Sequence, residues 1–98
     1  MKPDRPRLAR RYTISGRVQG VGFRYFAERV ARELKIVGYV RNREDGTVEV
    51  YAIGGASALD ELRDRLAGGP RSAQVARVEE SEAAVSDRYR DFVIEGGW

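Results

Sequence analysis

The pattern of hydrophobic and polar residues along the chain begins with a strand followed by a helix. Residues 12–18 alternate apolar and polar side chains with a period of two, which is typical of a strand with one buried face. Apolar residues then recur at helical spacing from Phe23 onward. The members of this stripe are Phe23, Phe26, Ala27, Val30, Ala31 and Leu34. The first third of the chain therefore predicts a strand, a glycine-rich connection and a helix with one buried stripe.

Two further strands follow, joined by a tight turn. Residues 36–42 predict one strand, and residues 47–53 predict another that alternates between two faces. Val48, Val50 and Ala52 occupy one face of the second run, and Thr47, Glu49 and Tyr51 occupy the other. The Asp45-Gly46 pair between the runs is typical of a hairpin turn. These residues predict a hairpin whose second strand has a polar face.

The remaining residues predict a second helix and two more strands. Ser57 and Asp60 resemble a capping box at the start of the helix, and the glycines and proline of residues 68–70 end it. The leucines that we expect to face inward are Leu59, Leu62 and Leu66. Residues 74–80 and 90–95 are the last two predicted strands, the second with Phe92 and Ile94 on one face.

The order β-α-β-β-α-β with a short last strand predicts an α+β, ferredoxin-like fold. In this split βαβ arrangement, an antiparallel sheet carries both helices on one face. A right-handed crossover makes the strands at 12–18 and 36–42 parallel, with the strand at 47–53 between them. We expect one domain over residues 12–95, preceded by a flexible basic arm at 1–11 and followed by an extension at 96–98.

The charge distribution changes the first impression of a basic protein. The whole chain of 98 residues has a formal net charge of +3. Residues 1–11 hold five basic side chains and one acidic side chain, so the rest of the chain is slightly acidic. The basic charge therefore belongs to a solvated arm and not to a folded basic face. This distribution weakens the case for a nucleic-acid-binding module.

The absence of two residue types excludes several kinds of site. The chain contains no cysteine and no histidine. Disulfides, thiolate zinc sites, histidine-based triads and phosphohistidine intermediates are thereby excluded. No apolar stretch approaches the roughly 18 residues of a membrane span, and the arginines near the N-terminus are not followed by the apolar segment of an export signal. We expect a cytoplasmic protein with no membrane partner.

The glycine loop "GRVQGVGFR", residues 16–24, carries the first candidate chemistry. Its spacing fits neither the P-loop nor the dinucleotide fingerprint. Glycine amides and a helix N-terminus together make a cup that suits a phosphate. A tight turn whose glycines adopt positive φ is the alternative. Arg24, on the unfavourable end of the helix dipole, favours the phosphate site, because a bound dianion would reverse that interaction.

Asn42 is the second candidate, at the end of the strand at 36–42. Asparagine commonly starts turns, so a purely structural role is the alternative. The predicted topology places the ends of the strands at 12–18 and 36–42 on one edge of the sheet. Two interstrand steps separate these ends by roughly 10 Å. A phosphoryl group and a water molecule would fit between Arg24 and Asn42.

At these residues the sequence resembles the acylphosphatase family. "GRVQGVGFR" and "GYVRNREDGTVEV" are similar to its two signature stretches, and "GGPRSAQV" is similar to the segment after its second helix. The resemblance implies hydrolysis of small acyl phosphates to a carboxylate and inorganic phosphate. It implies that Arg24 binds the phosphate and that Asn42 orients the attacking water. The loop amides implied as the cradle are those of Gln19, Gly20, Val21, Gly22 and Phe23.

The sequence departs from the family pattern at some positions, and two alternative functions remain. Lys35 stands where a glycine commonly ends the first helix, and Tyr39 stands where tryptophan is frequent. We expect no cofactor. We also expect no metal, because Asp45 is accounted for as a turn residue and Glu44 as a solvated charge, so neither is needed as a metal ligand. We expect a monomer. The rivals are a non-catalytic phosphate or acyl-phosphate sensor and a nucleic-acid-binding module. We do not expect nucleic acid as a partner, because strand 47–53 offers only Tyr51 for base stacking.

Overall fold

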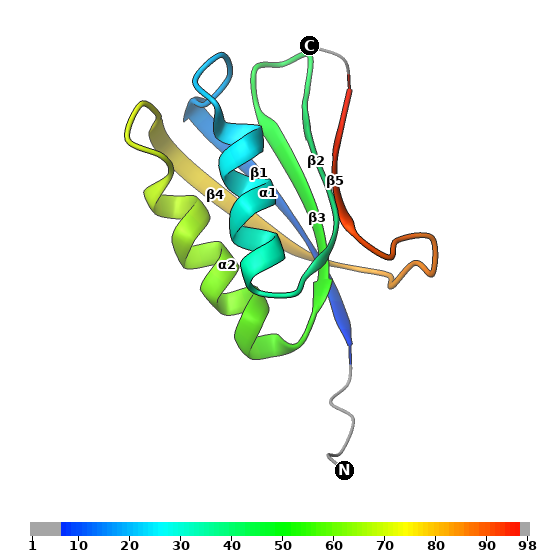
Figure 1. Cartoon of the computed structure of the whole chain (residues 1–98). Helices are drawn as coiled ribbons and strands as arrows, with labels where there is room; N and C mark the ends of the chain where they lie inside the picture. The colour runs from blue at the N-terminus through cyan, green and yellow to red at the C-terminus, as the bar shows by residue number, and fades with distance from the viewer. Residues whose placement is uncertain (1–6, 97–98) are drawn as a thin grey trace.

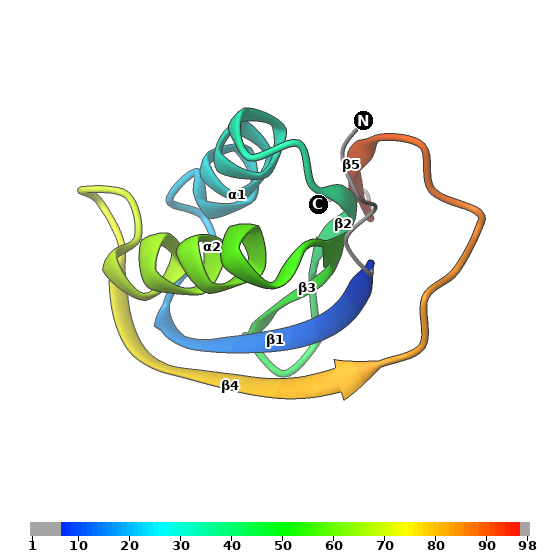
Figure 2. The same ribbon diagram turned by 90° about the horizontal axis from the view of Figure 1, so that it is seen from below.

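The computed structural model describes residues 7–96 and consists of one sheet and two helices (Figure 1). The elements are β1 (Leu8–Arg17), α1 (Phe23–Glu33), β2 (Val37–Asn42), β3 (Val48–Gly54), α2 (Ala56–Gly68), β4 (Gln74–Ala83) and β5 (Phe92–Glu95). The strand order is β4-β1-β3-β2-β5, so β4 and β5 form the two edges. Both helices lie on the same side of the curved sheet (Figure 2). The predicted α+β, ferredoxin-like architecture is confirmed.

The strand directions confirm one part of the predicted topology and correct another. β1 and β2 both pair antiparallel with β3 and are therefore parallel to each other, as the crossover rule predicts. β5, however, pairs parallel with β2, so the sheet predicted as antiparallel is mixed, with a parallel pair at this edge. The connection at 84–91 crosses from one edge to the other on the side away from the helices (Figure 2). As a result, β5 lies at the edge of the sheet beside β2, where Phe92 is fully buried.

The core lies between the helices and the sheet. Tyr12 and Ile14 of β1 face it, as the alternation predicts, and Phe23 anchors the start of α1. The three leucines expected to face inward from α2, Leu59, Leu62 and Leu66, are all fully buried. α1 packs against β2 and β5, while α2 packs against β4 and β1. Apolar burial on this one face is the main term that stabilises the fold.

The start of α2 corrects the predicted capping box. The N-cap residue is Gly55, and no side chain caps the helix. β3 ends at Gly54 and α2 begins at Ala56, so Gly55 alone connects the two elements. Ser57 therefore lies inside the first turn, two residues beyond the N-cap position where a capping side chain would act.

The basic arm is shorter than predicted. β1 begins at Leu8, so residues 8–11 belong to the sheet, and only residues 1–6 of the arm lie outside the described residues. Arg10 forms ion pairs of 2.8 Å with Asp60 and 2.9 Å with Glu80. Arg11 pairs with Glu49 at 3.1 Å. Acidic partners in the fold thus compensate two of the charges that were assigned to the arm. Of the extension at 96–98, only residue 96 is described.

The hairpin turn and the C-terminal end of α1 follow local rules. The Thr47 amide and hydroxyl both donate to Asp45 Oδ1, at 3.0 and 2.6 Å. These hydrogen bonds hold the pKa of Asp45 below its usual value, and they confirm Asp45 as a turn residue. After α1, Lys35 adopts a left-handed conformation with φ of 59°, in the position where the resemblance noted in the sequence leads us to expect glycine.

Candidate active site

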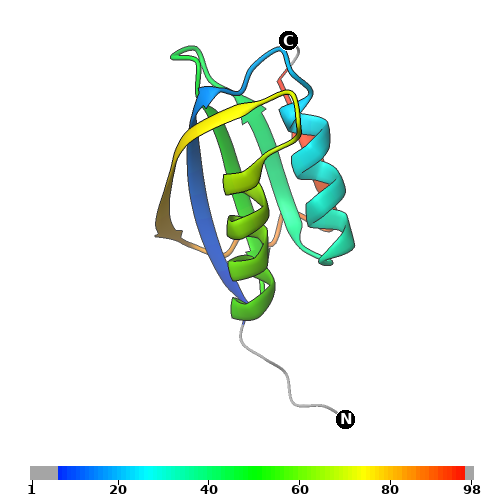
Figure 3. The ribbon, with the colours of Figure 1, turned by 90° about the vertical axis from the view of Figure 1, so that its left-hand side faces the viewer.

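The candidate site lies at the end of the sheet where β1 and β2 both terminate. The loop at 18–22 leads from β1 into α1, and the hairpin turn after β2 lies at the same end of the molecule (Figures 1 and 3). A small cavity of about 70 Å³ opens there. Its lining residues are Val18, Gly20, Gly22, Phe23, Arg24, Tyr25 and Asn42. Arg24 and Asn42, the two residues singled out in the sequence, thus line one cavity.

The backbone of the glycine loop is shaped for this cavity. Gly20 and Gly22 have φ values of 75° and 77°, a left-handed conformation that glycine adopts without steric cost. Gly22 is the N-cap of α1, and no side chain caps the helix. The first turn also contains no acidic residue. The positive end of the helix dipole therefore faces the cavity without a carboxylate to neutralise it.

Arg24 adds a guanidinium to this positive end. Within residues 7–96, no carboxylate forms an ion pair with Arg24. Two other arginines near the site differ, because Arg41 and Arg43 approach Glu49 Oε1 at 2.8 and 3.5 Å. The charge of Arg24 is therefore available to an anion in the cavity, while those of Arg41 and Arg43 are directed to Glu49.

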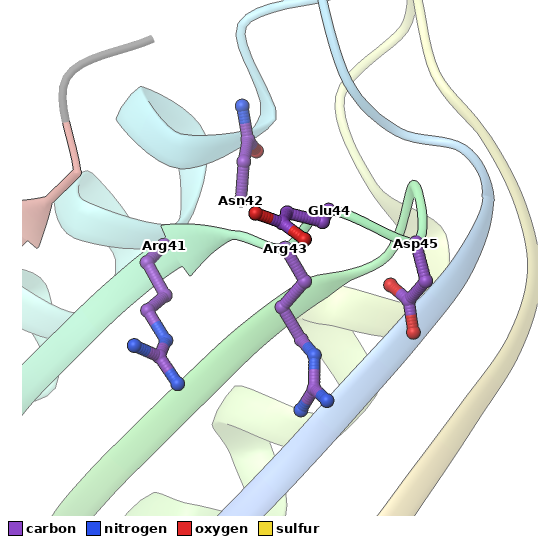
Figure 4. A pocket seen from close by; sticks show the side chains of 5 residues that line it. All are labelled: Arg41, Asn42, Arg43, Glu44 and Asp45. Atoms are coloured by element: carbon purple, nitrogen blue, oxygen red, sulfur yellow. The ribbon is translucent and has the colours of Figure 1, made fainter.

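The alternation of side chains along β2 determines the face on which Asn42 lies. Its exposed fraction is only 8%. Figure 4 shows Asn42 on one side of β2, pointing toward the loop before α1, with Arg41 and Arg43 on the other side. A second, open hollow of about 410 Å³ borders Asn42 and the turn residues that follow it. Because Glu49 binds both neighbours of Asn42 on the opposite face, the amide side chain is directed into the cavity.

Glu49 is a buried carboxylate whose role the sequence did not reveal. Its exposed fraction is 3%. Tyr39 Oη donates to Glu49 Oε2 at 2.7 Å, and Arg41 Nε donates to Oε1 at 2.9 Å. Burial alone would raise the pKa of Glu49, but these hydrogen bonds and the charges of Arg41 and Arg11 outweigh it and lower the pKa below its ordinary value. Glu49 is thus an ionised carboxylate that binds the arginines at the end of β2.

Two of the predicted loop residues lie outside the cavity lining. Gln19 Nε2 donates to the Arg43 carbonyl at 2.8 Å and to the Thr47 carbonyl at 2.9 Å. The Val21 carbonyl accepts a hydrogen bond of 2.9 Å from Ser72 Oγ. Gln19 therefore ties the glycine loop to the hairpin turn after Asn42, and Val21 ties it to the segment after α2. The remaining predicted loop residues, Gly20, Gly22 and Phe23, do line the cavity.

Tyr25 is a rim residue that the sequence analysis did not select. It lines the cavity beside Arg24, yet 68% of its surface is exposed. An aromatic residue off the buried stripe of a helix, next to a charged candidate, was the available signal. Tyr25 therefore forms part of the exposed rim of the cavity.

Among the described residues, no group of three or more acidic side chains is arranged to hold a metal ion. No helix between residues 7 and 96 is long and apolar enough to cross a membrane.

Comparison with known proteins agrees with this geometry. The family model Acylphosphatase matches residues 10–94. Proteins named Acylphosphatase from Solibacter usitatus and Koribacter versatilis are 53% and 49% identical over 89 residues, which span 91% of this chain and 92% and 81% of theirs. The crystal structure of acylphosphatase from Bacillus subtilis is similar with a TM-score of 0.87 and 36% identity, covering 91% of this chain and 99% of that one. The chain therefore belongs to the acylphosphatase family.

Proposed function

We propose that this protein hydrolyses small acyl phosphates to a carboxylate and inorganic phosphate by direct attack of water. The observation that carries the proposal is the small cavity at the glycine loop, which Arg24 and Asn42 line together. Membership of the acylphosphatase family supports the same activity. The separate roles of Arg24, Asn42 and the loop follow from the chemistry of phosphoryl transfer.

The glycine loop and Arg24 bind the phosphoryl group. Unpaired amides at a helix N-terminus attract an anion, and the planar guanidinium can donate two parallel hydrogen bonds to phosphate oxygens. The transition state of phosphoryl transfer is loose, with charge spread over the equatorial oxygens. Fixed donors aimed at those oxygens stabilise the transition state without reorganising, so a few groups account for much of the rate.

Asn42 orients the water that attacks phosphorus. The new bond forms between the water oxygen and phosphorus, while the bond from phosphorus to the acyl oxygen breaks. The leaving carboxylate has a conjugate acid with a pKa of about 4, so it departs without a proton and needs no general acid. The proton of the attacking water passes to an oxygen of the phosphate product. Asn42, which is neutral, therefore positions the water and does not act as a base.

The cavity dimensions indicate how the substrate is held. Pockets that enclose drug-sized ligands measure about 300–1,000 Å³, whereas this cavity measures about 70 Å³. Only the phosphoryl end fits inside, and the acyl group projects past Tyr25 toward solvent. Recognition thus acts on the phosphate, and many acyl groups are accepted. We also propose that the protein is cytoplasmic, since a chain without cysteine suits a reducing compartment. We further propose that it acts as a monomer.

Hydrolysis of benzoyl phosphate by the purified chain and four variants tests these roles. Arg24→Ala and Arg24→Lys should both lose turnover by about a hundredfold or more, because lysine cannot reproduce the bidentate contact. Asn42→Ala should lower kcat while phosphate inhibition changes little, because its partner is the water. Arg29→Ala, an exposed arginine on the same helix, is the matched control and should behave as the parent.

Three outcomes would contradict the proposal. Absence of acyl phosphate hydrolysis by the parent chain would remove the enzymatic function. Near-parental rates for Arg24→Lys would refute the bidentate contact. A change in phosphate affinity alone for Asn42→Ala would make Asn42 a binding residue.

A further inference from the structure

A second hollow lies on the face of the sheet opposite the helices, away from the phosphate cavity. Three tyrosines, Tyr39, Tyr51 and Tyr89, and two arginines, Arg11 and Arg88, contribute to its lining. We name it the tyrosine hollow. Its volume is about 470 Å³, which is in the range of sites that take small organic ligands. The connection at 84–91, which runs past the sheet in Figure 2, supplies one wall.

The three rings of the tyrosine hollow contact one another. The ring centroids lie 5.5 Å apart for Tyr39 and Tyr51, 5.8 Å for Tyr39 and Tyr89, and 5.7 Å for Tyr51 and Tyr89. In the sequence these residues are distant, and only Tyr51 was recognised as a sheet aromatic. The fold gathers them into a single aromatic cluster, in which Tyr51 is buried and the half-buried rings of Tyr39 and Tyr89 remain partly open to a planar ligand.

Hydrogen bonds fix the rings before any ligand arrives. Tyr39 Oη donates to Glu49 at 2.7 Å, and Tyr89 Oη donates to Glu95 at 3.4 Å. Tyr51 Oη donates to the Ala84 carbonyl at 2.5 Å and accepts from the Ser86 amide at 3.0 Å. The last two bonds also attach the connection at 84–91 to the sheet. A ligand that binds here therefore has little side-chain or loop ordering to bring about.

The charge of the tyrosine hollow is positive, since both charged residues of its lining are arginines. The Arg11 Cζ lies 5.4 Å from the Tyr51 ring centroid, and the Arg88 Cζ lies 5.5 Å from that of Tyr89. Arg11 also pairs with Glu49. Within residues 7–96 no carboxylate forms an ion pair with Arg88, which is exposed. Arg88 is therefore placed to bind an anionic group at the edge of the rings.

We propose that the tyrosine hollow binds a planar aromatic anion of the size of a nucleoside monophosphate. The base packs on the accessible parts of Tyr39 and Tyr89, and Arg88 holds the phosphate. A cation would be repelled by the two guanidinium groups, a neutral ring would leave Arg88 without an anionic partner, and a free phosphate would leave most of the hollow unfilled. A nucleotide combines a stacking ring with a group that arginine binds well.

NMR titration of the full chain with AMP tests this site. Amide signals of residues 84–89 should shift and saturate, and adenosine or inorganic phosphate alone should shift them at higher concentrations only. Arg88→Ala should weaken AMP binding at these residues by about tenfold or more, because a charge-assisted contact is lost. Arg90→Ala, an exposed arginine outside the lining, is the matched control and should not weaken it.

A crossed comparison separates this site from the phosphate cavity. Arg24→Ala should abolish phosphate binding at the glycine loop and leave AMP binding at residues 84–89 unchanged, whereas Arg88→Ala should retain benzoyl phosphate hydrolysis. The proposal is overturned by AMP shifts that are absent, that persist at full affinity in Arg88→Ala, or that disappear in Arg24→Ala. An oligoadenylate that binds far more tightly than AMP would also overturn it, in favour of a nucleic-acid strand.

Discussion

Replacement of Glu49 by glutamine tests whether a buried carboxylate holds the end of β2 in place. Glutamine keeps the volume of the side chain but removes its charge and turns one acceptor into a donor. The new amide group would face Tyr39 Oη or the guanidinium groups of Arg11 and Arg41, all of which now donate to Glu49. Glu49→Gln should therefore destabilise the fold and loosen the strand that carries Asn42.

The magnitude follows from the exposure of the partners. Breaking a fully buried ion pair costs about 3–5 kcal/mol. Here the side chain of Glu49 is only 4% exposed, but those of Arg11, Arg41 and Arg43 are 42%, 47% and 42% exposed, so water can solvate them after the change. Discounted for this screening, the expected loss is about 2–3 kcal/mol in the free energy of unfolding. For a domain of this size, that corresponds to a decrease in Tm of about 10–20 °C.

Urea denaturation followed by circular dichroism measures this loss, with a pH series as a second readout. The folded-state pKa of Glu49 is lowered, so its contribution is fully present above the unfolded value of about 4.3 and is lost as the pH falls through the folded-state value. The difference between the parent and Glu49→Gln should therefore be constant near neutral pH and shrink below about pH 4.

Glu79→Gln is the matched control, because Glu79 pairs with Arg77 on the exposed surface of β4. It should change stability by less than about 1 kcal/mol. Equal stabilities of Glu49→Gln and the parent at pH 7, or a difference between them that does not shrink in acid, would refute the anchoring role of the charge.

Three further predictions concern the helix, the rim and the reaction. Lys35→Gly should stabilise the fold by about 0.5–1 kcal/mol in urea denaturation, because glycine adopts the left-handed conformation without strain; an equal gain for Lys35→Ala would contradict this reason. Tyr25→Ala should raise KM for benzoyl phosphate about threefold to tenfold and leave KM for acetyl phosphate unchanged, since only the aromatic acyl group stacks on the ring. Equal changes for both substrates would exclude stacking. Turnover of benzoyl phosphate should persist in excess EDTA, because Arg24 and the loop amides supply the positive charge that a metal would otherwise bring; loss of turnover there would refute the metal-free mechanism.

The approach of Arg24 to Asn42 was predictable because general rules determine it. Alternation defines the strands, and a right-handed crossover makes β1 and β2 parallel, so their C-terminal ends share an edge of the sheet. The glycine loop then has only a few residues in which to enter α1. The structure accordingly places both side chains in the lining of one cavity, although the sequence could not give its volume.

The buried state of Glu49 was not predictable from a period of two. Alternation places Glu49 and Tyr51 on the face away from the helices, but it does not say whether water covers that face. The connection at 84–91, more than thirty residues later, covers Tyr51, and three arginines surround the carboxylate. The direction of β5 was missed for a similar reason, because a strand of four residues does not encode which edge it joins.

The edge position of β4 has a consequence for the behaviour of the protein at high concentration. An unpaired strand edge can recruit a second chain into a continuous sheet, which is a common first step of aggregation. The charged residues of β4 are Arg77, Glu79, Glu80 and Glu82. Charged side chains along an edge make such pairing between molecules unfavourable. The charged edge strand β4 thus protects the protein from intermolecular β-sheet growth.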